Sequence, residues 1–252
     1  MSADQYLQGI LNRESVDSGL LSPVRGVHAT LAPILQPWAN RFLISVSPSG
    51  SFAKGTANMS GTDIDLFISL SETTPETLKQ VYESLFNQMQ TAGYAPKRQN
   101  VSINVRVGGY SVDLVPAKRQ NILSTDHSLY RRKADTWTKT NVTTHINTVS
   151  ISGRIQEMRV VKLWRNQKGL DFPSFYLELT VINALAGKYG LLSQNVWSVF
   201  EYIRDRLANA VVSDPANSNN IISDDLTAAE KAGIVAAAAR ALSAKDWNEI
   251  VV

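Results

Sequence analysis

The chain contains, at residues 50–70, the stretch GSFAKGTANMSGTDIDLFISL. Its last part, Leu66 to Leu70, is an apolar run typical of a buried strand, and Asp63 and Asp65 stand directly in front of it. Side chains at positions i and i+2 of a strand point to the same face, so the two carboxylates should project together. Because like charges at this separation repel, the stretch predicts that a positive group lies between them.

A third carboxylate is expected beside this pair. Residues 101–107 alternate between apolar and polar, Gly108-Gly109 is a two-residue turn signal, and a second alternating run follows, which together predict a β-hairpin. Asp113 lies in the second run, and three carboxylates converge if that strand pairs beside the first. Two Mg²⁺ ions, or Mn²⁺, about 4 Å apart use such a cluster to clamp the oxygens of a phosphoryl displacement. The alternative is that Asp63 and Asp65 only end a turn.

Gly50-Ser51 suggests a phosphate site upstream of the acidic pair. The dipeptide follows a strand candidate, Leu43 to Val46, and opens a segment, Phe52 to Ala57, that could form one or two helical turns. Free backbone N–H groups at a helix start bind phosphate, and glycine lets the phosphate approach closely. A triphosphate would then bridge Ser51 and the metal ions.

The chain changes character near residues 120–126. Before this point strand signals alternate with helical ones, and the proline-containing segment 24–41 is expected to be helical with a kink or break. The predicted fold class is α+β, with a mixed sheet and helices in residues 1–125, a helical lobe in residues 126–252, and a cleft between them as the default site. Four helices are expected in the second half, at residues 154–168, 174–188, 194–211 and 226–242.

Composition limits the classes of function. Zero cysteines among 252 residues exclude disulfides and thiolate metal sites, and no apolar run approaches the roughly 18 residues of a membrane span. The N-terminus lacks the features of a secretion signal, so a cytoplasmic protein with no membrane partner is expected. Residues 118–168 carry 11 Lys and Arg residues against three acidic ones, which predicts either a polyanionic ligand or a solvated basic face. His28, His127 and His145 match no metal spacing and are expected to be surface or loop residues.

Taken together, these motifs resemble a known superfamily. Gly50-Ser51, the motif Asp63-Ile64-Asp65 before an apolar strand, and Asp113 in a later strand are similar to the catalytic signature of the DNA polymerase β-like nucleotidyltransferases. The string GSFAKGT…GTDIDLF most resembles the branch that holds archaeal-type CCA-adding enzymes, 2′-5′-oligoadenylate synthetases and the bacterial relatives of cyclic GMP-AMP synthase, the CD-NTases. Further segments match this branch in the expected order: K-x-W at Lys162, P-S-F-Y-L-E-L from Pro173 and DPANSNN from Asp214.

The resemblance implies a polymerase β-like core followed by a helical lobe, and it implies roles for residues of the first half. Asp63, Asp65 and Asp113 would be the catalytic metal ligands, and Asp113 would also help to deprotonate the attacking hydroxyl. Gly50 and Ser51 would contact the terminal phosphates of the nucleotide.

Three residues of the second half are assigned to nucleotide binding in the same way. Lys162 would reach the triphosphate, the alternative being that its stem follows apolar surface while the ammonium stays in water. Ser174 would also contact phosphate. Phe175 stands where the branch often has a tyrosine that stacks on the base, so the ring face is kept and any contact by the hydroxyl is lost.

The function implied by the resemblance is that of a Mg²⁺-dependent nucleotidyltransferase. It would join NTPs, with ATP among them, into a cyclic di- or trinucleotide messenger for bacterial antiphage signalling, and a downstream effector would respond to the product. Nucleic acid is not expected to be required. The enzymatic alternatives are linear oligoadenylate synthesis and CCA addition to tRNA, the latter disfavoured by a length of 252 residues because such enzymes carry further tRNA-binding domains. The non-enzymatic alternative is a nucleotide-binding, antitoxin-like protein, against which the three intact aspartates argue.

Overall fold

A computed structural model describes residues 1–17, 19, 22–61 and 63–252. The chain divides into two compact units. The sheet unit consists of Val16–Lys54 and Thr62–Ile146. The helical unit consists of Met1–Ser15, Gly55–Gly61 and Asn147–Val252.

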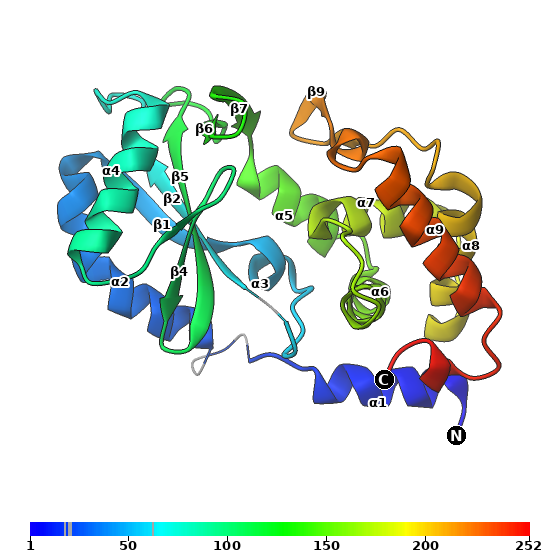
Figure 1. The fold of residues 1–252 in the computed structure, drawn as a ribbon. Helices are drawn as coiled ribbons and strands as arrows, with labels where there is room; N and C mark the ends of the chain where they lie inside the picture. Colours follow the sequence, from blue (N-terminus) through cyan, green and yellow to red (C-terminus); the bar gives the residue numbers. More distant parts are fainter. Residues whose placement is uncertain (18, 20–21, 62) are drawn as a thin grey trace. The chain divides into compact units, whose positions relative to one another are not determined.

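The sheet unit is built on a mixed sheet (Figure 1). Its strands are β1 (Leu43–Ser49), β2 (Ile64–Leu70), β3 (Lys97–Arg98), β4 (Ile103–Val107), β5 (Tyr110–Arg119), β6 (His127–Arg131) and β7 (Thr136–Thr140). Within the described residues the strand order is β1-β2-β5-β4-β3, with β6 and β7 continuing from the end of β5. Strands β2 and β5 are parallel and the other pairs are antiparallel. The predicted α+β class, with a mixed sheet, is therefore confirmed.

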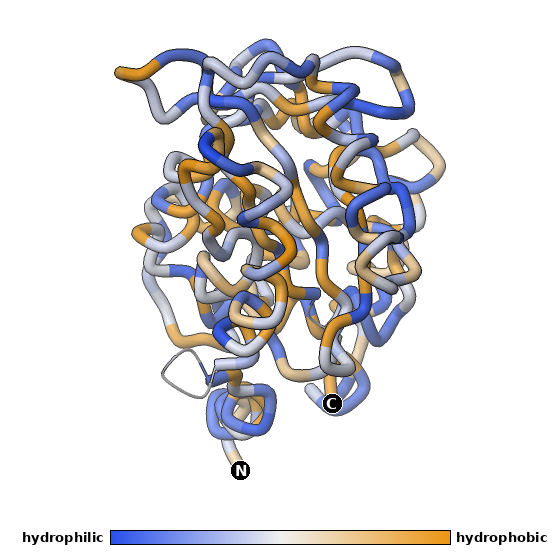
Figure 2. Tube along the Cα trace, turned by 90° about the vertical axis from the view of Figure 1, so that its left-hand side faces the viewer, coloured by the Kyte–Doolittle hydropathy of each residue, from blue (hydrophilic) through white to orange (hydrophobic). Residues whose placement is uncertain are grey.

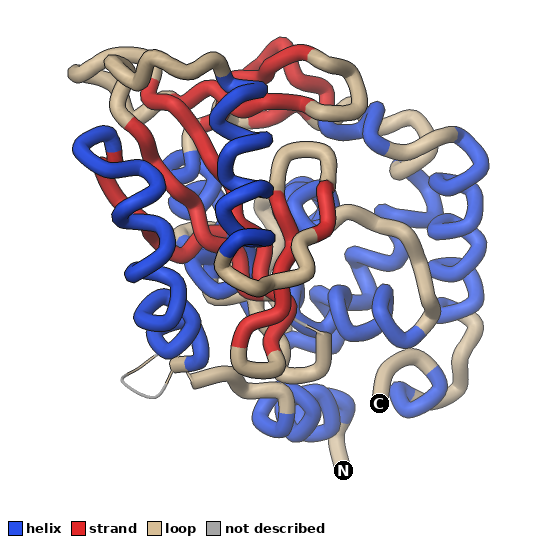
Figure 3. Tube along the Cα trace, turned by 60° about the vertical axis from the view of Figure 1, so that its left-hand side comes forward, coloured by secondary structure: helices blue, strands red, loops and turns tan. Residues whose placement is uncertain are grey.

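Helices α2 (Pro23–Ala39) and α4 (Leu78–Thr91) cover one face of this sheet (Figures 1 and 3). Alternate residues of β2, such as Ile64 and Leu66, are fully buried against the two helices and form the main core of the unit. The intervening residue, Asp65, therefore lies on the opposite face of the sheet. This alternation places Asp65 and Asp113 on the face opposite the two helices, beside a smaller apolar cluster that contains Phe67 and Ala117.

Two local predictions have different outcomes. The hairpin is confirmed, because Val107 pairs with Tyr110 across the two-residue turn and both Gly108 and Gly109 adopt positive φ (56° and 88°), which a type I′ turn requires. The expected break in α2 is not observed, since one helix runs through both internal prolines. Its buried side chains pack against the sheet along its whole length, and this tertiary packing outweighs the missing amide donors.

The helical unit contains the four helices expected in the second half. They are α6 (Ile155–Gln167), α7 (Ser174–Ala184), α8 (Leu192–Arg206) and α9 (Ala228–Leu242), joined by α1 (Ala3–Arg13) and by a small hairpin of β8 (Ser213–Asp214) and β9 (Asn217–Ile221). Trp164, Tyr176, Phe172 and Phe200 are the largest side chains of its buried core. Hydrophobic residues are distributed along the trace in short stretches (Figure 2), and none of the described helices is long and apolar enough to cross a membrane.

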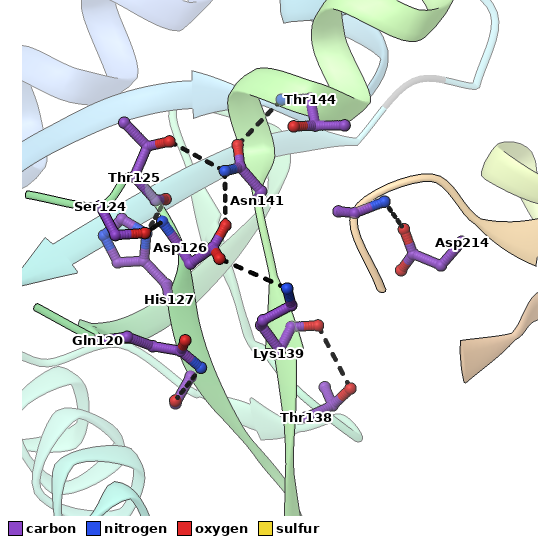
Figure 4. A network of polar contacts seen from close by, with 12 residues as sticks. Gln120, Ser124, Thr125, Asp126, His127, Thr138, Lys139, Asn141, Thr144 and Asp214 are labelled. Atoms are coloured by element: carbon purple, nitrogen blue, oxygen red, sulfur yellow. Dashed lines mark hydrogen bonds and ion pairs between the residues drawn. The ribbon is translucent and has the colours of Figure 1, made fainter. Parts of the chain in front are cut away.

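The two compact units differ from the division expected at residue 125. Strands β6 and β7 and the first turns of α5 (Val142–Ser150) belong to the sheet unit, because β6 pairs with the end of β5, whereas α1 belongs to the helical unit. Asn141 connects β7 to the loop before β6 and to α5 (Figure 4). Its amide nitrogen donates to Thr125 Oγ1 (2.9 Å) and Asp126 Oδ1 (2.7 Å), and its side-chain oxygen accepts from Thr144 N at the start of α5. The two strands are short and polar, so hydrophobic periodicity did not reveal them.

Candidate active site

The pairing of β2 with β5 brings two of the three predicted carboxylates side by side. Asp65 and Asp113 are direct partners in the parallel register, and Asp63 lies one residue before β2 begins. Both Asp65 and Asp113 are half-buried on the sheet face opposite α2 and α4, whereas Asp63 is exposed. The prediction that the strand of Asp113 pairs beside the strand of Asp65 is confirmed.

The surroundings of Asp113 oppose its ionisation. Burial raises the pKa of Asp113, a hydrogen bond from Asn104 acts in the opposite direction, and the negative charge of Asp63 raises the pKa further. The negative charges of Asp63 and Asp113 therefore repel each other. Such mutual repulsion is relieved when a cation lies between them.

A preformed metal cage is not present among the described residues. No group of three or more His, Cys, Asp or Glu side chains in that part of the chain is arranged to hold an ion. The donors that Asp65 and Asp113 offer on adjacent strands are nevertheless carboxylate oxygens, the ligands that Mg²⁺ prefers, and Mg²⁺ commonly binds to one or two carboxylates together with substrate phosphates. The donor chemistry thus fits a metal that arrives with its nucleotide.

Gly50 is required by its contact with Asp65. Gly50 opens the short helix α3 (Gly50–Lys54) with a φ of +57°, and a Cβ atom built on it would lie 1.7 Å from Asp65 Oδ2. No other residue type fits there without moving the carboxylate. From the sequence, this glycine was expected to let a phosphate approach, whereas in the structure it permits the approach of Asp65. Ser51 follows as the second residue of α3 and is half-buried.

Lys162 lies in the helical unit and is bonded inside it. Its side chain is buried, and Nζ donates to Glu178 Oε1 (2.5 Å) and to Thr56 Oγ1 (2.7 Å). The hydroxyl of Thr56 donates in turn to Glu178 Oε1 (2.6 Å). The alternative in which the ammonium reaches water is therefore wrong. The lysine links α6 and α7 to the segment Gly55–Gly61, which precedes the acidic pair in the chain.

Arg159, on the same helix, holds that segment at a second point. Its Nε donates to Asn58 Oδ1 (3.0 Å), and the amide of Asn58 donates back to the Arg159 carbonyl (3.0 Å). The Nη2 group donates to the carbonyls of Leu11 and Glu14 at the end of α1 (2.9 Å each). Sequence reasoning missed this network, because Arg159 carries no signal beyond its place in a basic helix.

Ser174 and Phe175, also in the helical unit, begin α7. Arg165 Nη1 donates to Ser174 Oγ (2.9 Å) and to the Phe172 carbonyl (2.7 Å), and desolvation lowers the pKa of this arginine. Phe175 is half-buried against the core of the unit. Arg165 was not predicted as a site residue. Its position three residues after Lys162, on the same helix face, could have indicated that it belongs to the same site.

Comparison with known proteins identifies the class of the sheet unit. Residues 34–126 match the family described as Nucleotidyltransferase domain. That range contains Gly50, Ser51 and the three aspartates, so this part of the chain is a nucleotidyltransferase domain. The family predicted from the sequence is confirmed.

Particular relatives extend this result. The chain is 24% identical over 155 residues to a cyclic AMP-AMP-AMP synthase from Escherichia coli (strain MS 115-1). The match covers 56% of this chain and 48% of that protein, so the chain spans about half the length of the curated relative it matches. Two structures of CdnC from E. coli MS115-1 align with this chain with a TM-score of 0.78 and cover 96% of it. The complex with HORMA-deltaN is 19% identical and is covered to 90% of its own chain, and the structure with ATP is 20% identical and is covered to 91%. The Cid1 poly(U) polymerase aligns with a TM-score of 0.69 at 13% identity, covering 95% of this chain and 93% of its own. These likenesses confirm the predicted fold.

Proposed function

We propose that this protein is a Mg²⁺-dependent nucleotidyltransferase that joins nucleoside triphosphates, ATP among them, into a cyclic di- or trinucleotide. The observation that carries the proposal is the pairing of Asp65 with Asp113 on adjacent parallel strands, with Asp63 one residue before the first strand. A carboxylate set of this kind suits phosphoryl transfer and has no evident role in folding, because it places like charges together.

In the proposed reaction, a ribose hydroxyl oxygen bonds to the α-phosphorus of an NTP, the bond to the bridging oxygen breaks, and pyrophosphate leaves. Asp63, Asp65 and Asp113 would hold two Mg²⁺ ions, with Mn²⁺ as a possible substitute, and the ions would stabilise charge on the attacking and leaving oxygens. Asp113 takes the proton of the attacking hydroxyl, for which a carboxyl whose pKa burial raises is better suited than a fully solvated one.

The nucleotide contacts proposed for the remaining residues rest on the sequence resemblance and on the local surroundings of each side chain. Gly50 and Ser51 at the start of α3 would face the terminal phosphates, and Ser174, oriented by Arg165, would contact phosphate as well. The half-buried ring of Phe175 would stack on a base. The Lys162 ammonium is buried and already donates to Glu178 and Thr56, so a direct contact with the triphosphate would have to share the ammonium with these partners.

A cyclic product is proposed ahead of a linear one because of the relatives. The curated relative is named as a cyclic AMP-AMP-AMP synthase, and a structure of CdnC contains ATP. The resemblance of the sequence motifs to the CD-NTases further implies a role in bacterial antiphage signalling in the cytoplasm, with an effector downstream of the product. The likeness to a poly(U) polymerase favours linear synthesis as the second candidate function.

The test is to incubate the protein with each labelled NTP and Mg²⁺ or Mn²⁺, without nucleic acid, and then to treat the products with phosphatase. We expect pyrophosphate release and a phosphatase-resistant product. A phosphatase-sensitive ladder would establish linear synthesis instead. Transfer activity that persists when Asp63→Asn and Asp65→Asn are combined would contradict the metal assignment and with it the proposed mechanism.

A further inference from the structure

The carboxylate of Asp113 is held by two amide side chains. Asn104 Nδ2 donates to Asp113 Oδ1 (2.7 Å), and Gln99 Nε2 donates to the same oxygen (3.2 Å). Both amides donate to Oδ1, and the Ser102 hydroxyl is a further hydrogen-bonding group beside the carboxylate. One oxygen of the group is therefore fixed by the protein, and the carboxylate plane is fixed with it.

Asn104 occupies a position set by the hairpin. It is the direct partner of Asp113 in the antiparallel register of β4 and β5, so the two side chains lie on the same sheet face. Its amide nitrogen also donates to Ser111 Oγ (2.9 Å), which engages both of its N–H groups. The amide is thereby locked with its donors toward β5, and its orientation cannot reverse without losing two hydrogen bonds.

Gln99 is oriented by the turn that precedes β4. Ser102 Oγ donates to Gln99 Oε1 (2.9 Å), so the amide presents its nitrogen, not its oxygen, to Asp113. The turn itself is anchored from α4, where the buried Tyr82 hydroxyl contacts the carbonyls of Gln99 (2.8 Å) and Ser102 (3.1 Å). A chain of hydrogen bonds thus runs from the core of the sheet unit to the carboxylate.

We propose that Asn104 and Gln99 are positioning residues for Asp113, which hold Oδ1 and leave Oδ2 to the metal ion and the attacking hydroxyl. This inference rests on the proposed function. Amide donors suit the task because they orient the carboxylate without cancelling its charge. A lysine or arginine in their place would form an ion pair and would compete with the metal ion for the same oxygens.

The experiment compares Asn104→Leu and Gln99→Leu with wild type and with a control, Arg106→Gln. Arg106 lies two residues from Asn104 on the same exposed face of β4 and donates to the Gly109 carbonyl, away from Asp113. Binding of Mn²⁺ to the nucleotide-bound enzyme is measured by electron paramagnetic resonance with a non-hydrolysable NTP analogue. NTP turnover gives kcat and KM, and thermal unfolding checks the fold.

Loss of a side chain that hydrogen-bonds to a metal ligand typically lowers metal affinity or activity about 10- to 100-fold. For Asn104→Leu we expect a loss of this order in both Mn²⁺ affinity and kcat, and for Gln99→Leu a smaller loss in both. The KM for NTP of these two variants should stay within about twofold of wild type, and Arg106→Gln should change none of these quantities. Gln99 is exposed, so its variant remains informative if Asn104→Leu unfolds.

Two outcomes separate the inference from the proposed function. If Asp113→Asn is inactive while folded Asn104→Leu and Gln99→Leu bind Mn²⁺ and turn over NTP like wild type, the positioning role is refuted and the nucleotidyltransferase assignment stands. If wild type and Asp113→Asn release pyrophosphate at the same rate, the proposed function itself fails.

Discussion

At the level of single residues, the candidate site residues differ in what their charges contact. Asp63 is exposed, and Asp65 and Asp113 are half-buried neighbours of like charge. Lys162, by contrast, is 4% exposed and bonded to a glutamate that is fully buried. Removing one carboxylate of the first group relieves repulsion, whereas removing one partner of the second leaves an unpaired charge in the core.

This contrast predicts the effect of Lys162→Met on stability. Breaking a buried ion pair by removing one partner typically costs about 3–5 kcal/mol, because the other charge stays buried without compensation. We expect a loss of this size in urea unfolding, and a smaller loss when Glu178→Leu is added. The control is Lys79→Met, which breaks the exposed pair with Asp135 and should change stability far less. A double variant less stable than Lys162→Met would show that the lost charge is not the cause.

Gly50→Ala tests the close approach of Asp65. The new Cβ would collide with the carboxylate, and the positive φ adds strain of about 1–3 kcal/mol for a residue other than glycine. We expect Gly50→Ala to lower the free energy of unfolding more than Gly93→Ala, whose φ is also positive (86°) but whose surroundings are open. Thermal unfolding of both variants makes the comparison. Equal losses would mean that the Asp65 contact is absent in solution.

At the level of elements, the junction between β2 and β6 depends on a histidine. His127 is 8% exposed, so the expectation that it lies on the surface is wrong. Its Nδ1 faces the Thr125 carbonyl (2.8 Å) and its Nε2 faces Ser69 Oγ in β2 (2.8 Å). Since the carbonyl can only accept, the proton lies on Nδ1 and Nε2 accepts from the serine. The neutral ring is the form that the fold holds.

This arrangement predicts a pH-dependent stability. Burial lowers the pKa of His127, so as pH falls below about 6.5 the unfolded chain binds a proton before the folded one does. The contribution of the neutral ring is complete above about pH 6.5 and is lost as pH falls toward the lower folded pKa. The stability difference between wild type and His127→Gln should therefore narrow between about pH 7 and 5 in chemical unfolding. A difference that stays constant over this range would contradict the assignment.

At the level of the whole molecule, most of the basic segment 118–168 is engaged internally. Lys118 donates to the carbonyls of Thr74 and Glu76, and Arg119 pairs with Glu72 (2.9 Å). Lys139 pairs with Asp126, and Lys162 with Glu178. Positive charges that are used in this way form neither a broad solvated face nor a long track for a nucleic acid.

We therefore expect turnover of free NTPs with no nucleic acid present and only a mild salt dependence. A protein that binds many phosphates loses several orders of magnitude in affinity between about 50 and 200 mM salt, whereas a site for two or three nucleotides involves few charge contacts. Initial rates across this range, with and without added tRNA, make the measurement. Absolute dependence on tRNA, with label at its 3′ end, would overturn cyclisation in favour of CCA addition.

The sequence alone was enough to identify the nucleotidyltransferase class, the hairpin, the helical second half and the candidate carboxylates. The hairpin and the acidic pair depend on spacing over a few residues, such as the i, i+2 positions of Asp63 and Asp65 and the glycine pair of the turn. The class was predicted from the resemblance of short motifs to a known superfamily. Only the tertiary structure decided that Asp65 faces Gly50, that Asn104 holds Asp113, and that Lys162 bonds to Thr56, a residue 106 positions earlier in the chain. It also decided that Gly55–Gly61 belongs to the helical unit although both of its neighbours in sequence belong to the sheet unit. These contacts arise from strand register and helix packing between distant parts of the chain, and the local pattern of the sequence does not specify them.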